Sequence, residues 1–381
     1  MTSEWNQPKG YKLTSPTELT EITNDLGVGR VSDSISYIAD DLFEMVHPDK
    51  QNEDNLEHAD ARRSFVDDIH EQGVSYGNWF YFDWNKTLVR YPESDDYYDL
   101  RTFRNRNLIT SDEQRQLRQK KIAVFGLSVG SKVVDDMTQL GIGNEYMLFD
   151  FDRLSPTNLN RLRATMSEVG QLKTTIAGQK MSELDPYLAQ QHHVTGYDEL
   201  SDGILRVEQP DVIIEEVDSI EVKAKIRRIA AELGIPVVMA GDVGDRSTID
   251  VERYDIGKTS PFNGKISTKD YEALLDGSMS EKDKEGILIK ILGIRNLSPR
   301  LLDSAMLRDT ELGGFPQLGT TATAGGALAT VAIRDIFLER GSGSVSRVYN
   351  PRDVLKSKPA TTFAQNVDII KRFIDYRKGD K

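Results

Sequence analysis

The chain has 381 residues, of which 29% are charged and 38% hydrophobic, and its formal net charge is −13. This length suits two or three domains of roughly 150 residues, and the composition is typical of a soluble globular protein. The acidic balance argues against a nucleic-acid partner, because such partners normally bind a basic surface. No run approaches the ~20 apolar residues that cross a bilayer, and Met1 to Tyr11 lacks the apolar core of a signal peptide. We therefore expect neither nucleic acid nor a membrane as a partner.

Residues 1–103 are expected to form a separate amino-terminal α+β region without a nucleotide-binding pattern. Its expected elements are helices starting at Ser15, Ile35 and Asp60, and an aromatic-rich hairpin with strands at 79–82 and 87–91. The acidic segment 93–99 that follows is expected to be a surface linker.

The next stretch has the order of a nucleotide-binding unit. A short apolar strand, Ile122 to Phe125, precedes a glycine turn, and a helical pattern runs from Lys132 to Leu140. A second strand, Tyr146 to Phe149, ends at Asp150. A glycine turn lets the backbone approach a phosphate at the positive end of the helix, and an acid about 20 residues further on can bind ribose hydroxyls.

The turn itself reads Gly126-Leu-Ser128-Val-Gly130-Ser131. It has only two glycines, so it does not meet the dinucleotide pattern G-x-G-x-x-G. Taken alone, it could also be a turn that merely packs a helix on a strand.

Polar residues after the second strand favour a triphosphate. Arg161 and Lys173 could clamp the phosphates, and Asn158 could hydrogen-bond to the same group. Magnesium on ATP is usually held by one or two carboxylates together with phosphate oxygens. Asp218, just past the apolar strand that begins at Asp211, supplies such a carboxylate.

The remaining pattern alternates strands and helices, which predicts an α/β fold: a doubly wound, Rossmann-like, mostly parallel sheet with helices on both faces. The expected helices are 168–184, 220–233, 287–307, 320–340 and 361–377, and the expected strands are 192–197 and 236–240. His192 and His193 are expected to be exposed on their strand. The polar segment 257–286 is expected to be a long loop that could serve as a lid. Asp242, Asp245 and Arg246 could line an acceptor-carboxylate site or form a turn.

Taken together, D-F-D at 150–152, N-L-N-R at 158–161, V-G-x-x-K at 169–173 and a later strand ending in an aspartate resemble the ThiF-type adenylyltransferases, relatives of the ubiquitin-activating enzymes. The resemblance covers about residues 104–340. A cysteine-free bacterial subgroup is closer still, through GLSVG at 126–130, EE-x-DS at 215–219 and DVER(F/Y)D at 250–255. It implies an adenylylation domain at 104–345 and a helical tail at 346–381.

The resemblance implies an ATP-dependent enzyme that activates a carboxylate as acyl-AMP and releases pyrophosphate. The acceptor would be the carboxyl terminus of a peptide or a ubiquitin-like protein. The chain has no cysteine, so no thioester can form on it. ATP chemistry favours the cytoplasm. A homodimer is implied as well, because Arg106 matches an arginine that reaches the ATP of the neighbouring subunit.

The implied residues fall into three groups. The catalytic set is Arg106, Arg161, Lys173 and Asp218. The magnesium ligand is Asp218. The ATP-binding set is Gly126, Ser128, Gly130, Ser131, Asp150, Asp152, Asn158, Arg161 and Lys173. Two alternatives stay open: an inactive family member that acts as a binding or scaffold protein, and a NAD-binding oxidoreductase on a similar fold.

Overall fold

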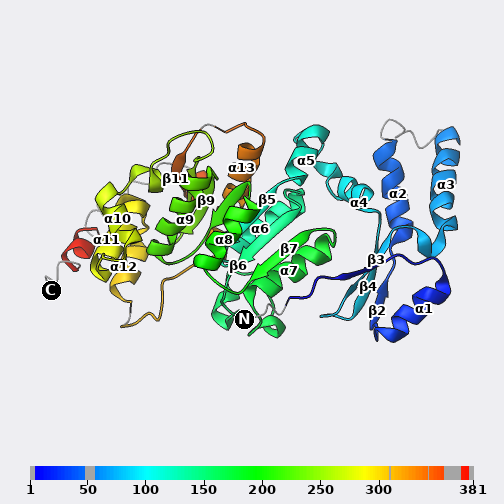
Figure 1. Ribbon diagram of the computed structural model, residues 1–381, viewed down its shortest axis with the longest axis horizontal. Helices are drawn as coiled ribbons and strands as arrows, with labels where there is room; N and C mark the ends of the chain where they lie inside the picture. The colour runs from blue at the N-terminus through cyan, green and yellow to red at the C-terminus, as the bar shows by residue number, and fades with distance from the viewer. Residues whose placement is uncertain (1–4, 48–55, 309, 342, 356–369, 377–381) are drawn as a thin grey trace.

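A computed structural model describes residues 5–47, 56–308, 310–341, 343–355 and 370–376. The molecule is elongated (Figure 1). The amino-terminal region lies at one end, the large sheet in the middle, and a group of helices containing α10, α11 and α12 at the other end.

The amino-terminal region is built on a four-stranded sheet in the order β1-β3-β4-β2, in which only the β2–β4 pair is parallel. Its elements are β1 (Lys9–Tyr11), α1 (Pro16–Asp25), β2 (Arg30–Ser32), α2 (Ile35–Val46), α3 (Leu56–Glu71), β3 (Asn78–Phe82) and β4 (Thr87–Tyr91). Ser15 caps α1 by accepting a hydrogen bond from the Glu18 N–H. The capped helix, the amphipathic helix and the hairpin are therefore confirmed.

The expected acidic linker is a helix instead, α4 (Ser94–Arg101). Asp95 and Asp96 lie in its first turn, where negative side chains stabilise the positive end of a helix. Its Tyr98 side chain is buried, and the hydroxyl lies within hydrogen-bond distance of the carbonyls of Gln114 and Gly141. The acidic run therefore encodes a packed helix.

The large sheet has seven strands in the order β11-β10-β9-β8-β5-β6-β7. The five strands from β9 to β7 are parallel, whereas β10 and β11 are antiparallel to their neighbours. The strands are β5 (Lys121–Phe125), β6 (Glu145–Phe149), β7 (Ala189–His193), β8 (Val212–Glu215), β9 (Val237–Asp242), β10 (Ser247–Glu252) and β11 (Val345–Tyr349). The sheet thus includes residues on both sides of the division expected at residue 345.

Helices cover both faces of this sheet, as predicted (Figure 1). They are α5 (Ser111–Arg118), α6 (Val129–Leu140), α7 (Lys173–Leu184), α8 (Glu199–Glu208), α9 (Ile220–Leu233) and α13 (Gly319–Phe337), with α14 (Pro351–Leu355) after β11. Alternate residues of β5 belong to different cores: Ile122 and Val124 pack in one cluster, Ala123 and Phe125 in the other. Because strand side chains alternate in direction, one buried strand joins two hydrophobic layers.

The polar segment 257–286 is not a structureless loop. It contains α10 (Thr268–Leu275) and the start of α11 (Glu281–Leu292), each with a serine cap. The expected helix 287–307 is divided, because Gly293 adopts a positive φ of 76° and α12 (Pro299–Met306) begins anew after Ser298. Of the expected helix 361–377, only residues 370–376 lie in the described part of the chain, and they are helical.

The two histidines of β7 are not exposed. The ring of His192 stacks on Trp5 at 4.3 Å between centroids, and burial lowers the pKa of His192 to about 3. The ring of His193 stacks on Phe149 at 4.6 Å. Both therefore pack against aromatic side chains.

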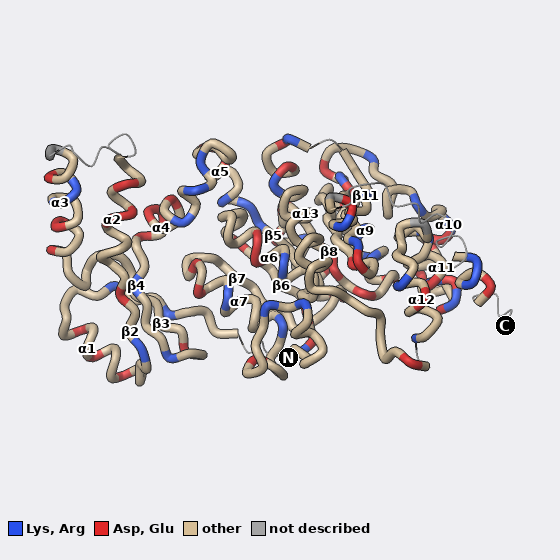
Figure 2. Tube along the Cα trace, turned by 180° about the vertical axis from the view of Figure 1, so that it is seen from behind, with Lys and Arg blue, Asp and Glu red and all other residues tan. Residues whose placement is uncertain are grey.

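Acidic and basic residues are interspersed along most of the trace (Figure 2). Within the described ranges, none of the helices has both the length and the apolar character that crossing a bilayer requires.

Helix α13 packs closely on α6 through glycine. A Cβ added at Gly326 would lie 2.6 Å from the Cβ of Lys132, so Gly326→Ala should destabilise the fold by about 1–3 kcal/mol through overpacking. The matched control is Gly203→Ala in α8, where an added Cβ meets no described atom within 4 Å. That change should stabilise the protein by about 0.5–1 kcal/mol, since alanine favours helix. Urea unfolding of the two variants measures both effects, and equal stabilities would contradict the close packing of α13.

Candidate functional site

The glycine turn lies at the carboxyl ends of the parallel strands. Gly126 has a φ of 87°, and a Cβ there would come within 2.5 Å of the Glu216 carbonyl oxygen, so only glycine fits. The helix begins at Val129, three residues earlier than expected. Ser131 donates to the Ser128 carbonyl, whereas the buried Ser128 hydroxyl has no hydrogen-bond partner among the described residues. A buried free hydroxyl at a helix start is available to a ligand.

Asp150 fastens the second strand to this turn. Its carboxylate accepts hydrogen bonds from the backbone N–H groups of Leu127 and Asp152, each at 2.7 Å. Burial raises the pKa of Asp150, and the nearby Lys173 ammonium opposes that shift. Each carboxylate oxygen can accept more than one hydrogen bond, so ribose hydroxyls could still bind there.

Lys173 is the first residue of α7. The helix expected over 168–184 therefore begins five residues later than predicted. The Lys173 ammonium lies 2.7 Å from Asp152 and 4.0 Å from Asp150. The Asp152 side chain is 52% exposed. The Lys173 side chain is only 10% exposed, whereas Asp152 faces solvent, so a triphosphate could replace Asp152 as the partner of Lys173 without leaving a buried charge unpaired.

Asn158 and Arg161 lie on the loop after β6. The Asn158 amide oxygen accepts the Ser155 N–H at 3.0 Å and leaves the amide donors for another acceptor. The Arg161 guanidinium donates to the Thr157 carbonyl and the Asn160 side chain, whereas its buried Nε has no partner among the described residues. Each side chain therefore retains donors that a phosphate could accept.

Two aspartates act electrostatically on Arg161. Desolvation lowers the pKa of Arg161, and the charges of Asp242 and Asp218 raise it again. Asp218 is exposed in the link after β8. Asp242 ends β9 two residues beyond the expected strand end and is not part of a turn.

Asp242 is unusual because both carboxylate oxygens are buried and neither has a hydrogen-bond partner in the described ranges. Burial raises the pKa of this carboxyl to about 6, although Arg161 opposes the shift. An unpaired buried carboxylate normally costs several kcal/mol, so Asp242 is a candidate for contact with a ligand.

Sequence reasoning missed Glu216. Its side chain accepts the Ala240 N–H at 2.6 Å, and a Cβ added at Gly130 would lie 3.6 Å from its Cγ. Burial raises the pKa of Glu216 well above the usual range. A signal was present, because two adjacent acids at the end of an apolar strand must point to opposite sides of the sheet.

Arg106 lies away from this group. It follows a short 3₁₀ turn (Phe103–Asn105). The guanidinium lies 4.4 Å from the centroid of the Phe103 ring and donates to the Met45 carbonyl. Within one subunit it therefore contacts the amino-terminal region, and any role toward ATP requires a second copy.

The described residues include no group of three or more histidine and acidic side chains arranged for a metal ion. One exposed carboxylate, Asp218, nevertheless fits magnesium that arrives with a nucleotide, because phosphate oxygens supply further ligands. A pocket of about 430 Å³ lies at the opposite edge of the sheet, lined by residues including Arg253, Ser260 and Ser344, and a smaller pocket lined by residues including Leu127, Ser131 and Lys173 lies at the candidate site. We place the candidate site at the carboxyl edge because the paired and unpaired charges gather there.

A family model described as ThiF family matches residues 102–358. The chain belongs to the ThiF family. Among curated relatives, the uncharacterized protein MT1398 of Mycobacterium tuberculosis is 35% identical over 68% of this chain and 36% of its own length. Ubiquitin-like modifier-activating enzyme 5 of Drosophila mojavensis is 29% identical over 37% of each chain. The chain thus spans little more than a third of these relatives.

Solved structures resemble this ThiF protein only distantly. Escherichia coli MccB with MccA-N7isoASN gives a TM-score of 0.48 at 14% identity and covers 82% of this chain and 86% of that chain. Escherichia coli tRNA N6-threonylcarbamoyladenosine dehydratase gives a TM-score of 0.45 at 15% identity. That match covers 64% of this chain and 95% of the dehydratase chain. Similarities at this level are uninformative about substrates.

The state of Asp242 predicts a pH-dependent stability. Its folded-state pKa is about 6, against roughly 4 when unfolded, so the folded protein binds more protons between these values. Deprotonation of Asp242 therefore lowers the free energy of unfolding progressively as the pH rises from about 4 to 6. The total loss is about 1–3 kcal/mol. Asp242→Asn should be more stable than wild type at pH 7.5 and equal to it near pH 4 in urea unfolding.

The exposed Asp41→Asn on α2 provides the control and should change stability little at either pH. Equal stabilities of Asp242→Asn and wild type at pH 7.5 would show that Asp242 has a partner in solution.

Proposed function

We propose that this ThiF protein is an ATP-dependent adenylyltransferase that activates a carboxylate. A carboxylate oxygen attacks the α-phosphorus, the new O–P bond forms, and the bond to pyrophosphate breaks. The observation that carries the proposal is the convergence of the glycine turn, Arg161, Lys173 and Asp218 at the carboxyl edge of three adjacent parallel strands.

Each of these groups has a physical role in such a transfer, where the protein contributes positioning and charge neutralisation. The start of α6 and the Ser128 hydroxyl would face phosphate oxygens. Arg161 and Lys173 would neutralise the charge that develops on the leaving pyrophosphate. Asp150 would hold the ribose, and Asp218 would bind Mg²⁺, which shields the phosphates when bound.

The acceptor we propose is the carboxyl terminus of a peptide or a ubiquitin-like protein. The support is the similarity to ubiquitin-like modifier-activating enzyme 5, whose name describes activation of such a modifier. The chain has no cysteine, so the nucleophile that takes the activated acyl group belongs to the acceptor or to another protein.

ATP binding tests the site directly. With Mg²⁺ present, calorimetry should show saturable ATP binding, and Lys173→Ala should weaken it about tenfold or more, because a charge-assisted hydrogen bond contributes about 1.5–3 kcal/mol. Lys121→Ala is the matched control, because Lys121 pairs with Glu145 at 3.1 Å where β5 and β6 begin, at the opposite edge of the sheet. It should bind ATP like wild type.

Absence of ATP binding by the wild type would favour the scaffold alternative. Binding of NAD in place of ATP would favour the oxidoreductase alternative.

The proposed homodimer makes a second prediction. If Arg106 acts across a dimer, Arg106→Ala and Lys173→Ala should each bind ATP weakly on their own. An equal mixture should regain full-affinity sites, because a mixed dimer has one site with Lys173 and the partner's Arg106. Calorimetric titration of the mixture measures them. A mixture that behaves as the average of its components would rule out the contribution in trans.

A further inference from the structure

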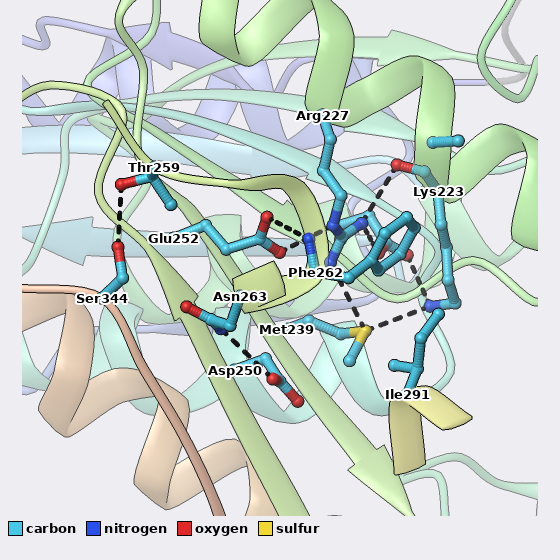
Figure 3. Close-up of polar contacts among 12 residues, drawn as sticks. Lys223, Arg227, Met239, Asp250, Glu252, Thr259, Phe262, Asn263, Ile291 and Ser344 are labelled. Atoms are coloured by element: carbon cyan, nitrogen blue, oxygen red, sulfur yellow. Dashed lines mark hydrogen bonds and ion pairs between the residues drawn. The ribbon is translucent and has the colours of Figure 1, made fainter. Parts of the chain in front are cut away.

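Four charged side chains lie together beneath the candidate site. Arg227 of α9 donates from Nη1 to Glu215 of β8 at 2.8 Å and from Nε to Glu252 of β10 at 2.7 Å. Lys223, one turn earlier on α9, lies 2.8 Å from Glu215. Figure 3 shows Arg227 and Lys223 extending from α9, with Glu252 on the opposite side of Arg227. Neither glutamate side chain nor Arg227 is more than 1% exposed.

Stability alone is a weak explanation for this network. Two acids and two bases balance one another, yet each buried ion has a desolvation cost of several kcal/mol, and apolar side chains of similar volume often stabilise a core as well or better. The backbone and side chains that the network holds in place say more about its role.

Glu215 holds the link that carries Asp218. This link consists of residues 216–218, between the end of β8 and the Ser219 cap of α9. The Glu215 carboxylate accepts the Val217 N–H at 3.0 Å, immediately before Asp218. The same carboxylate therefore binds Arg227 and fixes the backbone that positions the proposed magnesium ligand.

Glu252 in turn fixes Arg227. It accepts hydrogen bonds from Arg227, from the Tyr254 hydroxyl at 2.6 Å and from the Phe262 N–H at 2.8 Å. The Phe262 ring lies 4.2 Å from the Arg227 guanidinium carbon and covers it (Figure 3). With both carboxylates in place, Arg227 has little freedom to move.

We propose that Arg227 and Glu252 are positioning residues for the magnesium ligand Asp218. They act through Glu215 and the Val217 backbone and touch neither nucleotide nor metal. This inference rests on the proposed function. Loosening the network should weaken metal binding at Asp218, whereas the groups that face the phosphates, Lys173 and Arg161, lie on other elements and should be unaffected.

The test measures Mn²⁺ binding to the complex with a non-hydrolysable ATP analogue by electron paramagnetic resonance, and binding of the same analogue without metal by calorimetry. The variants are Arg227→Lys, which keeps the charge but not the two-pronged contact, and Glu252→Gln, which keeps the shape. Asp218→Asn gives the loss expected when the ligand itself is removed. Arg101→Lys is the matched control, because Arg101 of α4 is a buried arginine 2.7 Å from Asp185, which follows the carboxyl end of α7. Helix α4 lies well away from α9 (Figure 1).

Arg227→Lys and Glu252→Gln should weaken Mn²⁺ binding about 10–100-fold, the range typical of residues that orient a metal ligand. Metal-free binding of the analogue should stay at the wild-type value, and Arg101→Lys should change neither. If Arg227→Lys fails to fold, Glu252→Gln decides the question.

Wild-type Mn²⁺ affinity in both variants would overturn the inference and leave the proposed function intact. A parallel loss of metal-bound and metal-free analogue binding would also overturn it, since that is the effect of general destabilisation. A wild-type protein that binds no analogue under either condition would refute the proposed function itself.

Discussion

The close contact between the turn after β5 and the link after β8 is the constraint on which the site depends. Gly126 lies against the Glu216 carbonyl so closely that a Cβ would come within 2.5 Å. This contact brings the start of α6 next to the residues that lead to Asp218. Asp150, from the strand on the other side of β5, is tied to the same turn through the Leu127 N–H. Three adjacent strand ends therefore form one surface, where parallel sheets commonly bind ligands.

Charge is distributed unevenly around this surface. Lys173 has an exposed carboxylate partner, Asp152, which a phosphate could replace. Within the described part of the chain, the buried Nε of Arg161 and both carboxylate oxygens of Asp242 have no hydrogen-bond partner. Unsatisfied groups of opposite sign in one place are costly in a folded protein, and such groups are expected where a ligand completes the site. In the network of Arg227 and Glu252, by contrast, every carboxylate oxygen of Glu215 and Glu252 accepts at least one hydrogen bond, so the network belongs to the supporting structure.

The amino-terminal region contributes by anchoring α7. Tyr91 and Tyr97 donate to the carbonyls of Glu183 and Leu184 at the carboxyl end of that helix. Trp84 donates to the Glu183 side chain. The other end of α7 carries Lys173. A region without any nucleotide-binding pattern thus helps to fix the helix that carries Lys173 of the candidate site.

The sequence by itself determined the strand, glycine turn, helix and strand from Lys121 to Asp150. These elements depend on local spacing: buried apolar runs form the strands, and glycine permits the positive φ at 126. The serine cap of α1 and the hairpin of β3 and β4 were predictable for the same reason. Asp150, Arg161, Lys173 and Asp218 could be proposed as site residues because they lie in the segments that follow β6 and β8, whose carboxyl ends lie at one edge of the sheet.

Only the tertiary structure decided which side chains pair and which remain unpaired. The Lys173–Asp152 pair and the hydrogen bond from the Ala240 N–H to Glu216 join residues of different segments, so no local pattern predicts them. The unpaired carboxylate oxygens of Asp242 likewise depend on which described residues surround them. The antiparallel direction of β10 and β11 and the helices within 257–286 likewise depend on packing against distant elements. Sequence spacing encodes the local backbone, whereas the partners of buried charges are set by three-dimensional proximity.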